Sequence, residues 1–270
     1  MSKDQSSEQT REQENQPKMN SSALQTAKVR LRSLMKQRLS KLSQESISVQ
    51  SKTVFEALAR FKPYQDAKTV GVYLSMPGGE IQTDSIVRHA LASGKQVFVP
   101  YLHRSGLPPG EGPIRLMDMV SLRDEQDYES LQRDKWGIPS VDGATVNQRQ
   151  RSVGELDGER SVDAALDLIF LPGVAFDFDP ETGAVRRLGH GKGFYDYFLH
   201  RYALASNMDK EKTSSGSRPA VLLYALALKE QLLSPGSGES VPIGPHDQPI
   251  DGVLMGDGTI KESKAESGRD

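Results

Sequence analysis

The sequence predicts a three-layer α/β/α fold with a mostly parallel central sheet, built as a single domain with polar insertions in its loops. Residues 69–74 (TVGVYL) and 166–171 (LDLIFL) are short runs that are apolar on both faces, apart from Asp167. Strands of this kind suit a parallel sheet that helices cover on each side. Segments with helical spacing alternate with them, and 270 residues suffice for one large domain.

Four helices are expected. Residues 23–42 and 45–61 each place apolar side chains at helical spacing. Thr83 can cap a third helix that runs to about Ala92. A fourth helix follows the glycines near residue 190, because the next apolar side chains also lie at helical spacing: Phe194, Phe198, Leu199 and Tyr202.

The strands are expected as short apolar runs over residues 69–74, 96–99, 166–171, 221–227 and 252–254, with Pro100 ending the second. Residues 1–22 are expected to be a disordered tail, and residues 256–270 a flexible one, because both are polar and charged. Three internal segments rich in Ser, Gly, Pro, Gln or charge are expected to be unstructured insertions: residues 102–113, 142–162 and 204–219. The folded domain is therefore expected over residues 23–255.

Composition narrows the class of protein. The net charge of −2 gives no sign of a nucleic-acid partner, and without cysteine the chain has neither a disulfide nor a thiolate nucleophile. Mean hydropathy is −0.54, and no run approaches the ~18 apolar residues of a membrane span. The first 20 residues contain acids and no apolar core, so no import signal is expected. A cytoplasmic monomer is the expectation, with mitochondrial import through an atypical signal left open.

Three alternating glycines, Gly189, Gly191 and Gly193, precede the fourth helix. Glycines let backbone N–H groups converge, and a helix N-terminus adds a positive dipole end, which together suit a phosphate group. Taken alone, the G-x-G-x-G pattern is equally compatible with a structural turn. Arg187 and Lys192 bracket the turn with positive charge, which favours an anion site.

The segment RLGHGKGFYD, residues 187–196, resembles the signature of the 5-formyltetrahydrofolate cyclo-ligase family. Blocks at 28–32, 74–80, 117–119, 136–139 and 241–254 resemble further parts of that family in the same order, so the resemblance covers about residues 24–255. His190 stands where the family pattern is variable. The 74–80 turn is one residue longer than in the relative compared, and the 177–186 stretch is extended.

The resemblance implies phosphorylation of the formyl oxygen of 5-formyltetrahydrofolate by ATP, giving 5,10-methenyltetrahydrofolate, ADP and phosphate. It implies ATP contacts from Lys28, Arg32, Arg187, Leu188, Gly189, His190, Gly191, Lys192, Gly193, Phe194 and Tyr195. It implies substrate contacts from Leu74, Glu80, Trp136, His190, Gly191, Lys192, Gly193 and Phe194. Catalytic roles fall to Arg187, Lys192 and Tyr195, and Mg²⁺ would be held by Asp196 and Asp247.

Without the resemblance, the same residues also have purely structural explanations. Lys28 and Arg32 share a helix face, yet without the resemblance a solvated basic stripe explains them better. Asp196 suits the first turn of any helix, and a surface acid is the simpler interpretation of Glu80. Two other functions remain: a module that sequesters reduced folate or nucleotide without catalysis, and a sugar-phosphate isomerase, for which no base is evident. The folate substrate is expected with or without a polyglutamate tail.

Overall fold

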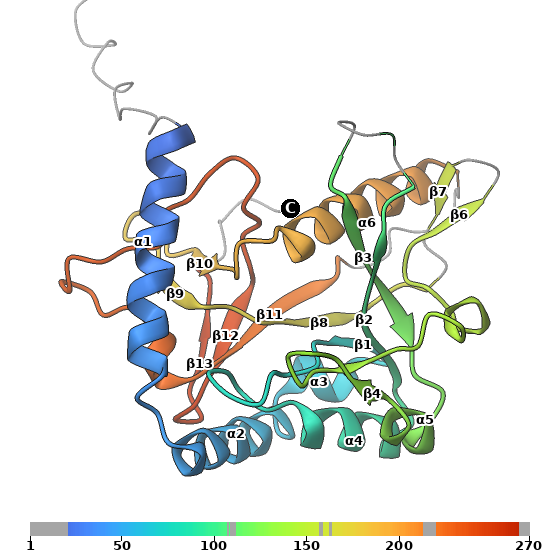
Figure 1. Ribbon diagram of the computed structural model, residues 1–270, viewed down its shortest axis with the longest axis horizontal. Helices are drawn as coiled ribbons and strands as arrows, with labels where there is room; N and C mark the ends of the chain where they lie inside the picture. Colours follow the sequence, from blue (N-terminus) through green and yellow to red (C-terminus); the bar gives the residue numbers. More distant parts are fainter. Residues whose placement is uncertain are drawn as a thin grey trace, which may run out of the picture.

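The computed structural model describes residues 21–106, 108, 112–156, 159–161, 164–212 and 220–264. Its centre is a seven-stranded sheet in the order β13-β12-β11-β8-β1-β2-β3 (Figure 1). The five inner strands run parallel, and the two edge strands are antiparallel to their neighbours. The strands are β1 (Thr69–Val72), β2 (Gln96–Arg104), β3 (Arg115–Ser121), β8 (Leu168–Leu171), β11 (Leu222–Ala227), β12 (Gly252–Met255) and β13 (Ile260–Glu262).

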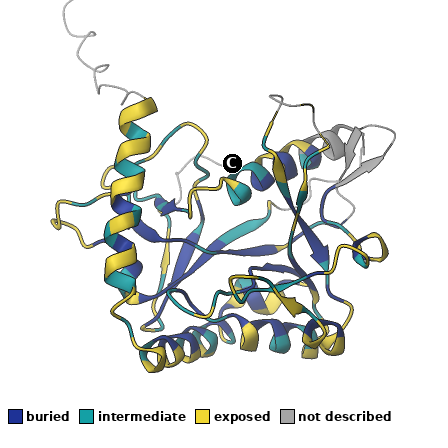
Figure 2. Ribbon diagram, in the orientation of Figure 1, coloured by how far each residue is buried: buried dark blue, intermediate teal, exposed yellow. Residues whose placement is uncertain are grey.

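Helices cover both faces of this sheet, which confirms the predicted three-layer α/β fold (Figure 1). The helices α2 (Gln44–Leu58), α3 (Lys62–Asp66) and α4 (Asp84–Ala92) lie on one face, and α6 (Phe194–Lys212) lies on the other. Side chains of β8 alternate between the two apolar clusters: Phe170 faces the first and Ile169 the second. Figure 2 shows the strands buried and the outer sides of the helices exposed.

The helix α1 (Ser21–Leu39) stands at one end of the sheet instead of over a face (Figure 1). Its buried residues Leu31 and Met35 pack in a third cluster with Ala175 and Leu188. Those two residues belong to an antiparallel hairpin formed by β9 (Ala175–Phe178) and β10 (Val185–Leu188). This packing holds α1 beside the segment that follows β10.

Smaller elements complete the described chain, and none of them was predicted from the sequence. They are α5 (Glu125–Glu129), β4 (Gln132–Arg133), β5 (Pro139–Ser140), η1 (Val146–Gln148), β6 (Gly154–Leu156), β7 (Glu159–Ser161) and η2 (Lys229–Gln231).

The end of β2 differs from the prediction. β2 does not end at Pro100 but continues to Arg104, paired with β3, so part of the expected 102–113 insertion is a hairpin. β1 pairs with β2 only as far as Phe98, which leaves one edge of β2 unpaired beyond that point. A proline is tolerated where its missing N–H faces such an edge.

Three further segments are more ordered than expected. The 142–162 insertion contains the β6–β7 hairpin, and α6 extends to Lys212 into the 204–219 insertion. The expected C-terminal tail begins with β13, reached through a turn at Gly258, whose φ is +84°. Of the predicted N-terminal tail, residues 1–20 lie outside the described residues, and the next two begin α1.

Thr83 occupies the position before α4, but its side chain does not cap the helix as predicted. Its hydroxyl donates instead to the backbone oxygen of Tyr73, at 2.7 Å. That bond ties the start of α4 to the end of β1, close to the loop that carries Glu80.

Candidate active site

The glycine turn lies between β10 and α6, where the predicted strand-to-helix change occurs. The strand that enters it is β10, not the buried run 168–171, because the β9–β10 hairpin intervenes. Gly191 and Gly193 have φ values of +90° and +68°, which side chains rarely tolerate. The first amides of a helix have no partner within the helix, so those of α6 point toward this turn.

Two arginines approach the turn so closely that side chains there would collide with them. A Cβ on Gly189 would lie 3.1 Å from Nη1 of Arg187, and one on Gly191 would lie 3.0 Å from Cζ of Arg32. The Nε of Arg32 also donates to the backbone oxygen of Gly189, at 2.8 Å. The glycines therefore make room for guanidinium groups from α1 and β10 in addition to freeing the backbone.

Arg187 is buried and held from two sides. Its Nη2 donates to Oδ1 of Asp196 at 2.6 Å, and its Nη1 donates to the backbone oxygen of Pro172 at 3.1 Å. Its Nε has no hydrogen-bond partner among the described residues. A buried donor without a partner is costly, so this nitrogen is available to a bound acceptor.

Asp247 meets α1 from the loop that precedes β12. Its Oδ1 accepts from Nζ of Lys28 at 2.6 Å, and its Oδ2 accepts from the amide of Gly244 at 2.6 Å. Partial burial lowers the pKa of Arg32, while the charges of Asp247 and Asp196 raise it. Both carboxylates are thus close enough to Arg32 to act on it, and the site combines α1, β10, α6 and this loop.

The two aspartates suit magnesium by their chemistry. Magnesium takes one or two protein carboxylates and completes its shell with substrate phosphates and water. The side chains of Asp196 and Asp247 keep 25% and 19% of their exposure, so both are accessible. No group of three or more acidic or histidine ligands occurs within the described ranges. Any divalent ion would therefore depend on ligands from a bound nucleotide.

Lys192 differs from the other cations at the turn. It is exposed, and no hydrogen bond or ion pair holds it among the residues that the structure describes. Leu188, in contrast, is buried against α1, and its backbone oxygen already accepts from Val174 at 2.7 Å. The side chain of Leu188 thus points away from the turn, and that of Phe194 packs against the second cluster.

Glu80 is buried, so its interpretation as a surface acid is wrong. Its Oε1 accepts from the amide of Met76 at 2.6 Å, and burial raises its pKa from 4.5 to about 7. Its Oε2 lies 4.0 Å from Nε2 of His190. Burial and the nearby charges of Arg187 and Arg32 lower the pKa of His190. Glu80 and the glycine turn therefore form one site.

Tyr195 contributes a second orphaned polar atom. Its hydroxyl is buried and has no hydrogen-bond partner in the described part of the chain. Burial is the main cause of its raised pKa, and the charge of Glu80 adds to it. The Tyr195 ring centroid lies 6.0 Å from Cζ of Arg187, so the tyrosine is close to Arg187 and is also influenced by the charge of Glu80.

Leu74 and Trp136 lie at the edge of this site. Leu74 is buried just past β1, at the start of the loop that ends in Glu80. The Trp136 side chain is 57% exposed, with Nζ of Lys135 4.3 Å from its ring centroid. A Cβ on Gly137 would lie 2.8 Å from Cγ of Pro77, so the tryptophan turn rests against the Glu80 loop.

Some partners at the site could not be found from side-chain patterns. The backbone oxygen of Pro172 and the amide of Gly244 hold Arg187 and Asp247, but any residue type supplies such groups. Their only sequence signal is position, since Pro172 ends the clearest predicted strand and Gly244 lies three residues before Asp247.

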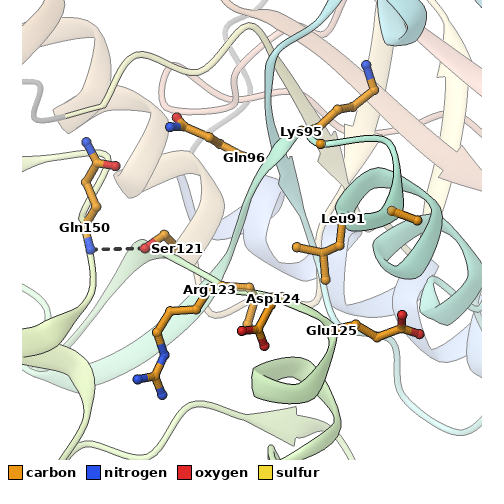
Figure 3. Close-up of a pocket in the computed structure, with 11 residues that line it drawn as sticks. Leu91, Lys95, Gln96, Ser121, Arg123, Asp124, Glu125 and Gln150 are labelled. Carbon is orange, nitrogen blue, oxygen red and sulfur yellow. Dashed lines mark hydrogen bonds between the residues drawn. The ribbon is translucent and has the colours of Figure 1, made fainter.

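A separate hollow of about 490 Å³ lies at the other end of the parallel strands (Figure 3). Arg123, Asp124 and Glu125 surround it together with Gln96, the first residue of β2. The glycine turn and Glu80 lie instead beyond the carboxyl ends of β8 and β1, where open α/β sheets bind ligands. The hollow therefore belongs to a different part of the surface. No helix in the described ranges is long and apolar enough to cross a membrane.

Comparison with known proteins identifies relatives of this chain. A Caenorhabditis elegans protein named probable 5-formyltetrahydrofolate cyclo-ligase is 33% identical over 241 residues, covering 88% of this chain and 97% of that protein. The 5-formyltetrahydrofolate cyclo-ligase of Mus musculus is 32% identical over 233 residues, covering 86% and 95%. The solved structure of Aquifex aeolicus 5,10-methenyltetrahydrofolate synthetase superposes with a TM-score of 0.54 at 22% identity, covering 90% and 95%, which supports the fold. Residues 24–256 match the 5-formyltetrahydrofolate cyclo-ligase family, and the chain belongs to that family.

Proposed function

We propose that the chain catalyses the ATP-dependent cyclisation of 5-formyltetrahydrofolate to 5,10-methenyltetrahydrofolate, releasing ADP and phosphate. Membership of the family supports the reaction. The observation that best supports the location of the site is the contact of Arg32 with the glycine turn, a 2.8 Å hydrogen bond from its Nε to the backbone oxygen of Gly189. That bond joins the cations of α1 to the helix N-terminus expected to hold phosphate.

The chemical difficulty is the formamide oxygen, which is a poor leaving group. Transfer of the γ-phosphoryl group of ATP to this oxygen converts it into a phosphate ester that leaves readily. N10 of the folate then attacks the formyl carbon and closes the ring. The enzyme must hold the γ-phosphate against the formyl oxygen and neutralise charge during transfer.

The cations divide this work according to how firmly each is held. Arg187 is buried, and its Nη1 donates to the backbone oxygen of Pro172, so it offers a fixed donor to the phosphate. Lys192 is exposed and can follow the transferring phosphoryl group. Lys28 and Arg32 project from one face of α1, Arg32 to Gly189 of the turn and Lys28 to Asp247, where they hold the remaining phosphate charge.

The folate occupies the side of the turn that faces Glu80. The buried carboxyl of Glu80 can accept hydrogen bonds from the amino and ring N–H groups of the pterin. The hydroxyl of Tyr195, which has no partner among the described residues, feels the charges of both this carboxyl and Arg187. Leu74 and Phe194 supply apolar contact, and the exposed ring of Trp136 can stack on a flat ring of the substrate.

Asp196 and Asp247 are the residues that would hold Mg²⁺, which would neutralise phosphate charge on the bound nucleotide. To do so, each carboxylate would give up its present contact with a cation, Asp196 with Arg187 and Asp247 with Lys28. Those cations would then be available to the phosphates of ATP.

Family membership disfavours both the sequestering module and the isomerase. The proposal includes a monomeric, cytoplasmic enzyme that accepts folate with or without a polyglutamate tail. Size-exclusion chromatography with light scattering tests the monomer, and turnover of mono- and pentaglutamate substrates tests the tail.

The decisive experiment mixes purified protein, Mg²⁺, ATP and 5-formyltetrahydrofolate. Methenyltetrahydrofolate is followed by its absorbance and ADP by a coupled assay. The two products should form in equal amounts and only when both substrates are present. Tight folate binding without ADP formation by folded protein would instead favour the sequestering module.

A further inference from the structure

His190 occupies the centre of the glycine turn, between the two halves of the proposed site. Its imidazole is 47% exposed, and its Nε2 lies 4.0 Å from Oε2 of Glu80, on the folate side. Arg32 and Arg187 contact the glycines that flank it, on the phosphate side. A reacting group held between ATP and folate would therefore lie within reach of this imidazole.

The charges around His190 come from four segments of the site. Arg32 on α1, Arg187 on β10 and Lys192 on the turn are cations, whereas Glu80 on the loop after β1 is an acid. The two arginines and burial oppose protonation, so the imidazole is held as a free base at neutral pH. In the tautomer that carries its proton on Nδ1, the Nε2 of such a free base can accept a proton and has none to donate.

The second half of the proposed reaction releases one proton. The lone pair of N10 forms the new bond to the formyl carbon, and the carbon–oxygen bond breaks with its electrons leaving on phosphate. The electrons of the N10–H bond return to nitrogen and delocalise over N5, carbon and N10. The proton that leaves N10 needs an acceptor.

We propose that Nε2 of His190 accepts the N10 proton during ring closure, an inference that rests on the proposed function. The resulting imidazolium stands 4.0 Å from Glu80, which stabilises it when that carboxyl is ionised. When the phosphates of a bound nucleotide lie against Arg32 and Arg187, their negative charge offsets the repulsion between these arginines and a protonated imidazole. His190 is thus a stronger base with nucleotide bound than in the free protein.

A single-turnover experiment on the full chain separates the two chemical steps. His190→Gln keeps a polar side chain of similar size but has no titratable group. ADP should form at the unchanged rate, whereas methenyltetrahydrofolate should appear about 10²-fold more slowly, the lower end of a general base's contribution. In the unsubstituted protein, the rate of ring closure should fall as the solution is acidified, and this dependence should be weaker in the variant, in which Glu80 still titrates.

Two further variants make the test specific. His190→Ala should regain part of its ring-closure rate when imidazole is added, because free imidazole can replace the missing base. His200→Gln changes an exposed histidine on α6 outside the site and should leave both steps unchanged. Equal slowing of ADP and methenyl formation in His190→Gln, or no slowing of either, overturns the proposal. Absence of ATP-dependent product from the unsubstituted protein would contradict the proposed function itself.

Discussion

The ammonium of Lys28 and the carboxylate of Asp247 lie 2.6 Å apart, although 219 positions separate them in the sequence. The pair joins a cation proposed for ATP phosphate to an acid proposed for Mg²⁺. Arg187 and Asp196 repeat this relationship, also at 2.6 Å. Without ligand, each of these charges is therefore neutralised by its partner, and a nucleotide with its metal would have to replace both partners.

Asp247→Asn is expected to change ATP binding in opposite directions with and without Mg²⁺. Removal of the carboxylate frees Lys28, so metal-free ATP should bind about three- to tenfold more tightly. MgATP should bind more weakly, by about tenfold, because one proposed metal ligand is lost. Isothermal titration calorimetry with EDTA or with excess Mg²⁺ measures both affinities.

Asp66→Asn is the matched control for this prediction. It breaks another Lys–Asp pair, in which Nζ of Lys62 lies 2.7 Å from Asp66, on the exposed surface of α3. Both ATP affinities should stay unchanged in this variant. If Asp247→Asn weakened ATP binding both with EDTA and with Mg²⁺, the ion pair with Asp247 would not be what keeps Lys28 from the phosphates.

Lys192→Ala is expected to abolish most turnover without affecting stability. Its ammonium is exposed and makes no described contact, so the variant loses no interaction of the folded state. Loss of one donor to a transition-state charge lowers kcat by roughly 10²–10³-fold. Steady-state kinetics and thermal unfolding measure the two effects, with the exposed Lys52→Ala on α2 as control. Normal turnover in Lys192→Ala would remove this residue from the mechanism.

Gly191→Ala should destabilise the folded protein more than Gly193→Ala. Both glycines have positive φ, so each substitution incurs a backbone cost of about 1–2 kcal/mol. At Gly191 the new Cβ also meets the guanidinium of Arg32 at 3.0 Å, whereas nothing lies within 4 Å at Gly193. Urea unfolding without ligand compares the two. Equal losses would mean that Arg32 moves aside freely.

The sequence predicts the glycine turn and the face of α1 because both depend on local spacing. Lys28 and Arg32 lie four residues apart, and any helix places such residues on one side. Their partners Asp247 and Gly189 depend on the tertiary fold, which no spacing rule supplies. Family resemblance assigned these residues together, but the cross-pairing of cations and acids is visible only in the structure.

The sequence contains turn signals for the β9–β10 and β12–β13 hairpins, although neither hairpin was predicted. The β9–β10 connection contains Asp179 and Gly183, and the latter has a φ of +71° as a tight turn requires. The turn before β13 contains Asp257 and Gly258, again a pattern typical of hairpins. A polar stretch around such a pair is as compatible with a β-turn as with disorder, so composition alone misassigned the residues around β13 to a flexible tail.

Glu80→Gln should stabilise the protein at neutral pH relative to the unsubstituted chain. Burial raises the pKa of Glu80 from 4.5 to about 7, so the folded state holds a proton that the unfolded state releases between these values. Stability from this group is therefore complete below pH 4.5 and declines as the pH rises toward 7. A tenfold change in a proton's binding constant corresponds to about 1.4 kcal/mol, so the full decline in unfolding free energy amounts to about 3 kcal/mol.

A glutamine side chain does not titrate, yet its amide oxygen can still accept from the amide of Met76, as Glu80 does at 2.6 Å. The difference in unfolding free energy between Glu80→Gln and the unsubstituted protein should therefore grow between pH 4.5 and 7 and stay constant above. Urea unfolding across this range measures it. A difference that does not change with pH would mean that Glu80 titrates at its ordinary pKa, and that its carboxyl is already fully ionised when it meets the pterin.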